Sequence, residues 1–205
     1  MEPLKVAEAM LPTEYGEFRI LGFESPVPSL DARRFRESLV VLVMGAPETR
    51  ASTLVRIHSQ CLTGETFRSA RCDCGQQLDL ALRRISEEGH GIVIYQLAEG
   101  RGIGLMNKLS AYELQDRRGH DTVEANHQLG FGADERTYEV SAAVLRTLGV
   151  RGIRLMSNNP QKITALEEAG FDPVERIPLE IPASDTTESY LRTKKDKLGH
   201  LLSGV

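Results

Sequence analysis

The sequence predicts an α/β fold, a single domain with a mixed β-sheet flanked by helices, and three observations support this. Short apolar runs such as "SLVVLVMG" (38–45) and "GIVIYQL" (91–97) are typical of buried strands. Other segments, such as "GQQLDLALRRISEEG" (75–89), carry apolar residues at helical spacing. Strands and helices alternate through the second half of the chain, which is characteristic of α/β proteins.

The first half of the chain is expected to begin with strands. Residues 4–23 predict a strand and hairpin turning at "TEYGE", and residues 24–36 an irregular connection. Buried strands follow at 38–45 and 52–59, with "APET" as the turn between them. A helix over 75–89 ends at Gly89, and the strand over 91–97 leads into a helix over 105–118.

The second half predicts one long loop and then regular elements. Residues 121–133, "DTVEANHQLGFGA", show neither the helical nor the strand period of apolar residues. They also carry many polar groups, which favours a functional loop. A helix over 134–149 is expected, with Asp134 as its N-cap and Gly149 as its stop. A strand (152–157), a helix with Pro160 in its first turn (159–170), an edge strand (171–181) and a helix (187–202) complete the prediction.

Composition limits the class of protein. The 205 residues are 40% hydrophobic and 26% charged, enough apolar material for the core of one domain. The formal net charge of −4 argues against a dedicated nucleic-acid binder, which usually carries a basic face. The N-terminus lacks a signal-peptide pattern, and no apolar run approaches the roughly 18 residues of a membrane span. A cytoplasmic protein with reduced thiols is therefore expected.

The three cysteines, Cys61, Cys72 and Cys74, form the pattern C-x10-C-x-C. Their odd number, the strained ring that a Cys72–Cys74 bridge would close, and a reducing compartment all argue against a disulfide. Cys72 and Cys74 share one face if extended, and Cys61 can fold back toward them. Three thiolates with water as a fourth ligand are typical of a catalytic zinc site. Two alternatives stay open: incidental thiols, or a closed structural site completed by His58 or His127.

Cationic residues beside these cysteines indicate an anionic ligand. Arg56 interrupts the apolar strand "TLVRIHS" just before Cys61, which suits bidentate binding of phosphate. In "YQLAEGRGIGL" the glycines would let backbone amides approach an anion, although an ordinary strand-to-helix turn explains the pattern equally well. Glu99 there could accept from a base edge, and Arg101 could hold phosphate.

Two predicted helix starts carry a misplaced cation. Lys162 in "MSNNPQK" and Arg136 in "GADER" fall in a first helical turn, where the helix dipole disfavours positive charge. A bound anion would give both a purpose. Helix capping alone accounts for Ser157, Asn158 and Asn159.

Taken in order, "RIHSQCLTGETFRSARCDCGQQL", "EGRGIGL", "DTVEANHQLGFGADER" and "SNNPQK" resemble GTP cyclohydrolase II, the zinc enzyme that opens riboflavin biosynthesis. The resemblance runs from about Arg56 to the C-terminus. It implies a single GTP cyclohydrolase II-like catalytic domain over 1–205, with an N-terminal strand region at about 1–50 and a catalytic core at about 51–205.

The resemblance also implies the roles of individual residues. Cys61, Cys72 and Cys74 would bind one zinc ion per subunit, with water completing the site. Asp134 matches the proton acceptor, Arg136 the proposed nucleophile toward the α-phosphate, and Tyr112 a tyrosine placed near the base during ring opening. The implied GTP contacts are Arg56, Ile57, His58, Ser59, Gln60, Gln77, Glu99, Gly100, Arg101, Thr122, Ser157 and Lys162.

The implied reaction removes C8 of guanine as formate, releases pyrophosphate and gives 2,5-diamino-6-(5-phosphoribosylamino)pyrimidin-4(3H)-one. Zinc would activate the attacking water, and Mg²⁺ is expected on the triphosphate. Because guanidinium is almost always protonated, Arg136 suits an electrostatic clamp better than a nucleophile. A cytoplasmic homodimer is expected from the resemblance.

Two residues depart from the family pattern. Gln60 stands where Glu is usual, which removes a charge beside Cys61, and Ser157 stands where Thr is commoner. The first change leaves room for a diverged homologue that releases pyrophosphate and retains the formyl group. A non-catalytic, zinc-stabilised nucleotide-binding protein is the alternative from another class.

Overall fold

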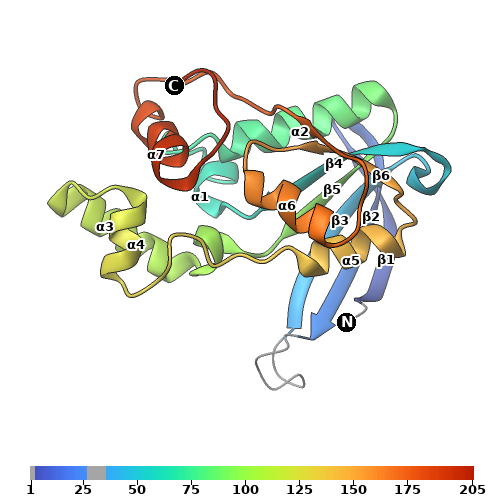
Figure 1. Ribbon diagram of the computed structural model, residues 1–205, viewed down its shortest axis with the longest axis horizontal. Helices are drawn as coiled ribbons and strands as arrows, with labels where there is room; N and C mark the ends of the chain where they lie inside the picture. Colours follow the sequence, from blue (N-terminus) through green and yellow to red (C-terminus); the bar gives the residue numbers. More distant parts are fainter. Residues whose placement is uncertain (1–2, 27–35) are drawn as a thin grey trace.

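The sheet combines an antiparallel and a parallel part. The computed structural model describes residues 3–26 and 36–205 (Figure 1). Within these residues, seven strands form one sheet in the order β1-β2-β3-β5-β4-β6-β7. The first three strands and the β3–β5 pair are antiparallel, and β5, β4, β6 and β7 run parallel. The strands are β1 Leu4–Thr13, β2 Gly16–Pro26, β3 Arg36–Met44, β4 Ser52–Ser59, β5 Gly91–Gln96, β6 Gly152–Met156 and β7 Val174–Ile177.

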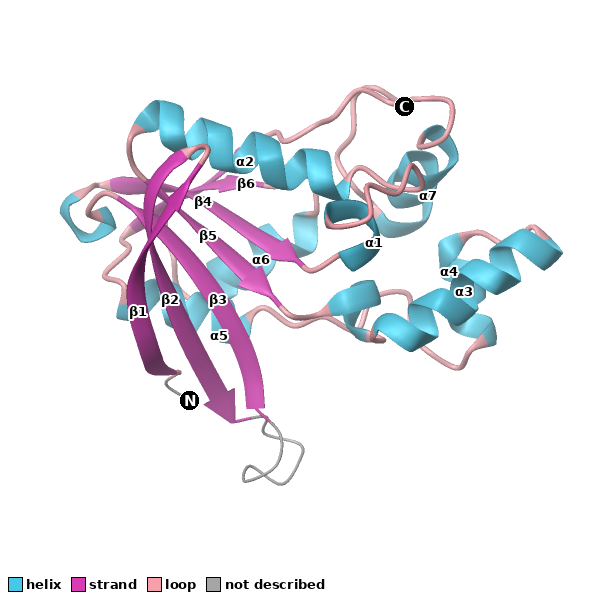
Figure 2. Ribbon diagram, turned by 180° about the vertical axis from the view of Figure 1, so that it is seen from behind, coloured by secondary structure: helices cyan, strands magenta, loops and turns pink. Residues whose placement is uncertain are grey.

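Helices cover both faces of this sheet and gather beyond one edge. In Figure 2, α2 lies on one face and α5 and α6 on the other, while α1, α3, α4 and α7 gather beyond the ends of β4 and β5. The mixed sheet with flanking helices confirms the predicted fold class. The helices are α1 Leu62–Glu65, α2 Cys74–Glu88, α3 Leu105–Arg118, α4 Thr122–Gln128, α5 Glu139–Thr147, α6 Pro160–Glu168 and α7 Glu188–Leu198, with 3₁₀ turns η1 Pro47–Thr49 and η2 Glu99–Gly102.

Strand alternation divides the core and places the first functional side chain. Successive side chains of β4 point to opposite faces of the sheet. Val55 and Ile57 are fully buried in the cluster that includes α5 and α6. Leu54 packs in the cluster of Ala81 and Ile85 from α2, and full burial of such a side chain stabilises the fold by about 1.5–3 kcal/mol. Arg56, two residues after Leu54, therefore points toward α2.

Most of the predicted elements are confirmed, including the N-terminal hairpin, the strand at 52–59 and the edge strand near residue 174. The predicted connection 24–36 is wrong for residues 24–26, which belong to β2, and for Arg36, which begins β3; residues 27–35 lie outside the described part. The "APET" turn contains the 3₁₀ turn η1. The one-turn helix α1 is not apparent from the sequence pattern.

The region 121–149 corrects two predictions. The expected loop over 121–133 contains α4, which is capped by Asp121. The Asp121 carboxylate accepts from two backbone N–H groups, and the Glu124 carboxylate accepts from the Asp121 N–H. The expected helix over 134–149 starts only at Glu139. Asp134 is therefore not an N-cap, and Arg136 does not lie in a first helical turn. Gly149 adopts the predicted left-handed conformation, with φ 71°.

The carboxyl ends of the parallel strands β4, β5 and β6 meet at one edge of the sheet. In parallel sheets, ligands bind beyond this edge. None of the helices formed by the described residues is both long and apolar enough to cross a bilayer.

Candidate functional site

A cavity of about 490 Å³ lies beyond the carboxyl ends of β4, β5 and β6. Ile57 and Asp134 are not among its lining residues. The predicted site residues that do line it are Arg56, His58, Ser59, Gln60, Cys61, Cys72, Cys74, Gln77, Glu99, Gly100, Arg101, Tyr112, Thr122, Arg136, Ser157 and Lys162. The fold therefore brings together segments that are far apart in the sequence, from Arg56 to Lys162.

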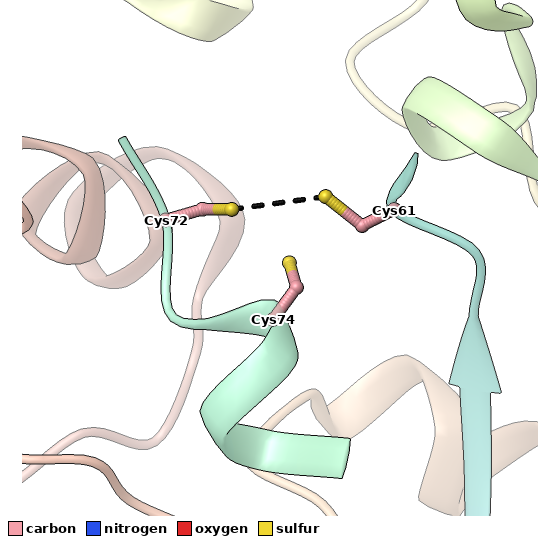
Figure 3. A group of neighbouring side chains, drawn as sticks. All are labelled: Cys61, Cys72 and Cys74. Atoms are coloured by element: carbon pink, nitrogen blue, oxygen red, sulfur yellow. Dashed lines mark hydrogen bonds between the residues drawn. The ribbon is translucent and has the colours of Figure 1, made fainter. Parts of the chain in front are cut away.

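The three cysteine side chains converge on one point (Figure 3). Their Sγ atoms all lie within 4.8 Å of one another, and those of Cys61 and Cys72 are 3.7 Å apart. Tetrahedral zinc with Zn–S bonds of about 2.3 Å places two sulfurs roughly 3.8 Å apart. The donor set therefore fits zinc. The expectation that Cys72 and Cys74 lie on one face of an extended segment is wrong, because Cys74 already begins α2.

Gly64 in α1 makes this convergence possible. A Cβ at this position would lie 2.8 Å from Cys72 Sγ and 3.2 Å from Cys61 Sγ. Both distances are too short, so any side chain at position 64 would displace the sulfurs. Hydrogen bonds from the Cys72 and Cys74 thiols, together with the nearby Lys108 ammonium, lower the pKa of Cys61 well below its ordinary value. The thiolate, the form that binds metal, is thus favoured at Cys61.

Neither histidine considered as a fourth ligand joins this group. His58 Nε2 bonds Glu65 Oε1 at 2.8 Å, and its Nδ1 lies 3.5 Å from Arg56. Burial lowers the pKa of His58 to about 4, so the ring is neutral at pH 7. His127 is exposed on α4. Among the described residues, the cluster with metal-binding geometry contains only the three cysteines.

Glu65 is a site residue that the sequence analysis missed. Its carboxylate accepts from His58, from the backbone N–H of Cys61 at 2.8 Å and from the Tyr95 hydroxyl. It thereby fixes the point where β4 passes into the cysteine segment. Its position four residues after Cys61 would have been a signal only if α1 had been recognised.

Lys108 is a second missed residue, and it connects the cysteines to Glu99. Lys108 Nζ donates to Glu99 Oε1 at 2.7 Å and to Cys61 Sγ at 3.2 Å. Burial opposes the charge, but these two partners raise the pKa of Lys108 above its ordinary value. The other Glu99 oxygen accepts from the Leu62 N–H at 2.7 Å. Both Glu99 oxygens therefore accept hydrogen bonds within the protein, in addition to any contact with a base edge.

The Gly-rich turn presents a cation rather than a row of free amides. Gly100 and Arg101 adopt left-handed conformations, with φ 64° and 59°, which turn the chain back sharply. The Gly100 and Gly104 amides donate to Glu99. The Arg101 atoms Nη1 and Nη2 are buried and have no hydrogen-bond partner among the described residues. Buried donors are normally satisfied, so a ligand acceptor is expected here.

Arg56 and Lys162 are two buried basic residues that line the cavity. Arg56 donates to the Met156 carbonyl and to Gln77 Oε1, while its Nε has no partner in the described part of the chain. Burial lowers the pKa of Arg56 to about 10. Lys162 donates to the Ile57 carbonyl at 2.8 Å. Burial, followed by repulsion from Arg56 and Arg136, lowers the pKa of Lys162 well below its ordinary value. A bound anion would relieve this repulsion.

Arg136 and Asp134 form a bidentate ion pair. Arg136 Nε and Nη2 bond the two Asp134 oxygens at 2.8 and 2.5 Å, and Nη1 donates to Ser59 Oγ at 3.1 Å. Burial opposes the charge of both groups, but the pairing raises the pKa of Arg136 and lowers that of Asp134. Both are therefore charged at neutral pH, and Asp134 orients the guanidinium that lines the cavity.

Tyr112, on α3, lies close to the cysteine segment. Its hydroxyl is 3.2 Å from Thr63 Oγ1, and the Arg71 guanidinium lies over its ring at 4.8 Å. Ser157 Oγ accepts from the Asn159 N–H at 3.1 Å, and the Asn159 side chain caps α6. The capping interpretation of that segment is confirmed for Asn159.

Helix α7 supplies part of the wall that the sequence did not predict. Tyr190 and Lys194 of α7 line the cavity, and so does His200, which follows the helix. Lys194 forms a buried ion pair with Asp73. Leu191 and Lys194 are both buried and lie three residues apart, on the inward face of α7. This helical spacing was the signal in the sequence that could have placed Lys194 on that face.

Comparison with known proteins gives a consistent result. The profile of the GTP cyclohydrolase II family matches residues 4–178. The chain is 50% identical over 203 residues to GTP cyclohydrolase-2 of Shigella boydii, covering 99% of this chain and 100% of that protein. It is 51% identical over 199 residues to riboflavin biosynthesis protein RibBA of Chlorobium phaeovibrioides, covering 97% of this chain but only 47% of that longer protein.

Among solved structures, RibBX of A. baumannii, a two-domain 3,4-dihydroxy-2-butanone 4-phosphate synthase, matches with a TM-score of 0.48 and 18% identity. The match covers 88% of this chain and 41% of that one, and this weak likeness does not bear on function. The profile match and the near-complete relatives agree with the cysteine cluster and the cationic cavity. The chain belongs to the GTP cyclohydrolase II family.

Proposed function

We propose that this chain hydrolyses GTP in the first step of riboflavin biosynthesis. The reaction opens the guanine imidazole ring, releases formate and pyrophosphate, and gives 2,5-diamino-6-(5-phosphoribosylamino)pyrimidin-4(3H)-one. The observation that carries the proposal is a cluster of three cysteines, with the geometry to hold a metal ion, in the same cavity as the unsatisfied guanidinium donors of Arg101. A nucleoside triphosphate presents both a ring to be attacked and an anion to be bound.

The metal proposal is one zinc ion per subunit, held by Cys61, Cys72 and Cys74. The sulfur separation and the lowered pKa of Cys61 support it. Zinc in this donor set would supply a Lewis acid that activates water at neutral pH. Lys108 would offset part of the negative charge of the three thiolates, because it contacts the Cys61 sulfur.

The cationic residues are proposed to bind the triphosphate together with Mg²⁺. Arg56, Arg101 and Lys162 would hold phosphate oxygens, since Arg101 has unsatisfied donors and Lys162 is buried beside other cations. Such preorganised charges stabilise the charge that develops in the transition state. His58, Ser59, Gln60, Gln77, Glu99, Gly100, Thr122 and Ser157 would complete the substrate contacts, and Ile57 would act through its carbonyl bond to Lys162.

Arg136 is proposed as an electrostatic clamp on the α-phosphate. Its raised pKa favours this role over that of a nucleophile, which would require a neutral guanidine. Asp134, which is ionised, orients Arg136 and would also serve as proton acceptor. Tyr112 would lie near the base during ring opening. We further propose a cytoplasmic homodimer in which residues 1–205 form one catalytic domain acting on a small molecule rather than on nucleic acid.

The test is proton and phosphorus NMR of zinc-loaded protein with GTP and Mg²⁺, kept anaerobic because the product oxidises. Formate and pyrophosphate in equal amounts are expected. Pyrophosphate without formate would instead identify a diverged enzyme that retains the formyl group, for which Gln60 gives a reason. If neither formate nor pyrophosphate is released, the proposal is overturned and a nucleotide-binding role is left.

A further inference from the structure

A buried ion pair ties helix α7 to the turn between two of the cysteines. Lys194 Nζ lies 3.0 Å from Asp73 Oδ1, and the two side chains are only 10% and 2% exposed. Asp73 stands between Cys72 and Cys74, so the ion pair attaches α7 directly to the turn that carries both sulfurs. The two partners are 121 residues apart in the sequence.

Asp73 gives up its ordinary local role to make this contact. It occupies the N-cap position of α2, where an aspartate usually accepts from the first backbone N–H groups of the helix. Within the described structure its side chain makes no such capping bond. One oxygen instead accepts from Lys194 and the other from Gln77 Nε2 at 2.5 Å.

The contact continues from Asp73 into the floor of the cavity. Gln77, which donates to Asp73, accepts from Arg56 Nη2 at 2.6 Å, and Arg56 Nη1 donates to the Met156 carbonyl at the end of β6. The orientation of Asp73 therefore determines which way the Gln77 amide faces. That amide in turn orients the Arg56 guanidinium.

Lys194 is itself held in place by the docking of α7. Its ammonium lies 4.4 Å from the centre of the Tyr190 ring, a cation–π contact. Lys197, one turn further along, pairs with Glu124 on α4 at 2.8 Å. Beyond the helix, the Leu201 N–H donates to the Asn158 carbonyl at 2.8 Å. Thus α7 connects the cysteine turn, α4 and the loop after β6.

We propose that Lys194 is a positioning residue for the metal centre: through Asp73 it fixes the Cys72–Asp73–Cys74 turn and orients Gln77 and Arg56. This inference rests on the proposed function for its catalytic consequence, but not for its effect on metal binding. Removing one member of a buried ion pair leaves the other charge unpaired, so the turn would rearrange to solvate Asp73. Partners beyond the metal ligands typically change metal affinity by about 10- to 100-fold.

The test compares zinc affinity, by competition with a chromophoric chelator, in four proteins without nucleotide. We expect Lys194→Met to bind zinc at least about 10-fold more weakly than wild type. Lys194→Arg, which keeps the charge and a donor, is expected to recover most of the affinity. Lys195→Met is the matched control, because Lys195 is an exposed neighbour on the same helix and its loss should leave the affinity unchanged.

Cobalt(II) substitution adds a readout of geometry. The visible and thiolate-to-metal absorption bands of the Co²⁺ protein are expected to shift in Lys194→Met and not in Lys195→Met. If Lys194→Met alone does not fold, the double variant Lys194→Met/Asp73→Asn removes both charges and should fold, with zinc affinity still lowered. A merely structural role for Lys194 predicts wild-type zinc affinity and spectrum in whichever variant folds, and that result would overturn the inference.

Turnover separates this inference from the proposed function. Wild-type protein that releases no formate or pyrophosphate would defeat the proposed function, whatever the zinc affinities show. Active wild-type protein combined with unchanged zinc affinity in Lys194→Met would defeat only the inference. If the proposed function and the inference are both correct, the kcat of Lys194→Met at saturating zinc is expected to fall because the geometry is altered. The Lys194→Arg variant is expected to restore kcat.

Discussion

The antiparallel and parallel parts of the sheet differ in what their ends carry. Strands β1 to β3 hold none of the predicted site residues, and their charged side chains include exposed pairs such as Lys5–Glu8 and Arg19–Glu8. Strands β4, β5 and β6 end at the cavity, with charged groups buried there, including Arg56 and Glu99. Both parts contribute fully buried apolar side chains to the core, from β2 and β3 in the first and from β4, β5 and β6 in the second. The difference is that only the parallel strands end side by side at one edge, where side chains distant in sequence can meet.

The sharpest test of this division is Cys72→Ser, from which we expect the largest effect. Loss of one of three thiolates should remove zinc and abolish formate release, while the sheet, which does not depend on the sulfur, stays folded. NMR of the products and circular dichroism measure the two consequences. If the variant unfolds globally, the metal is structural and the cavity is part of the scaffold.

Arg136→Ala is expected to have the next largest effect. Removing a preorganised charge at a transition state typically lowers kcat by about 10²–10³. GTP binding, measured by calorimetry, should be largely kept because Arg56, Arg101 and Lys162 remain. Arg50→Ala is the control, since Arg50 is exposed before the opposite end of β4 and should not change kcat. Near-normal turnover in Arg136→Ala would remove this residue from the mechanism.

Acid should destabilise the protein through His58 in the parallel part. Burial lowers the pKa of His58 from 6.5 to about 4. Between these values the unfolded chain binds more protons than the folded one, so stability is lost as pH falls from 6.5 toward 4. The unfolding free energy lost over this pH range because of His58 is about 3 kcal/mol. Urea unfolding at several pH values should show a flatter acid dependence in His58→Gln; an unchanged slope would mean that His58 titrates normally.

Val41→Ala in β3 should have the smallest effect on turnover. Val41 is fully buried on the antiparallel part, and its truncation costs about 2 kcal/mol of unfolding free energy. Because no site residue depends directly on this strand, kcat per folded molecule should equal that of wild type. A lowered kcat at full folding would show that the two parts are mechanically coupled.

Local signals predicted the elements well where a single pattern dominates. The strand at 52–59 was predicted with its observed bounds because its apolar residues, Leu54, Val55 and Ile57, form a short run, and Gly89 marks the end of α2 as expected. The capping box of Asp121 was overlooked because α4 is too short to display a helical period. Asp134 resembles an N-cap locally, but its carboxylate pairs with Arg136, so the helix starts later.

The candidate site was predicted as a set of residues but not as a network. The cysteines and most of the residues predicted to contact GTP lie together at the cavity. Glu65, Lys108 and Lys194 were missed, because each acts on a residue that the fold, rather than the sequence, brings near. A buried lysine is recognised only when its partner is known. Sequence spacing does not supply that partner.

The Lys194–Asp73 contact also has a consequence for the order in which the molecule assembles. Closing a loop of 121 residues costs more chain entropy than the contacts within the cysteine segment, so this pair is expected to form late in folding. During synthesis the three thiols emerge long before α7 exists. We therefore expect the proposed metal site to reach its final geometry only after α7 has docked.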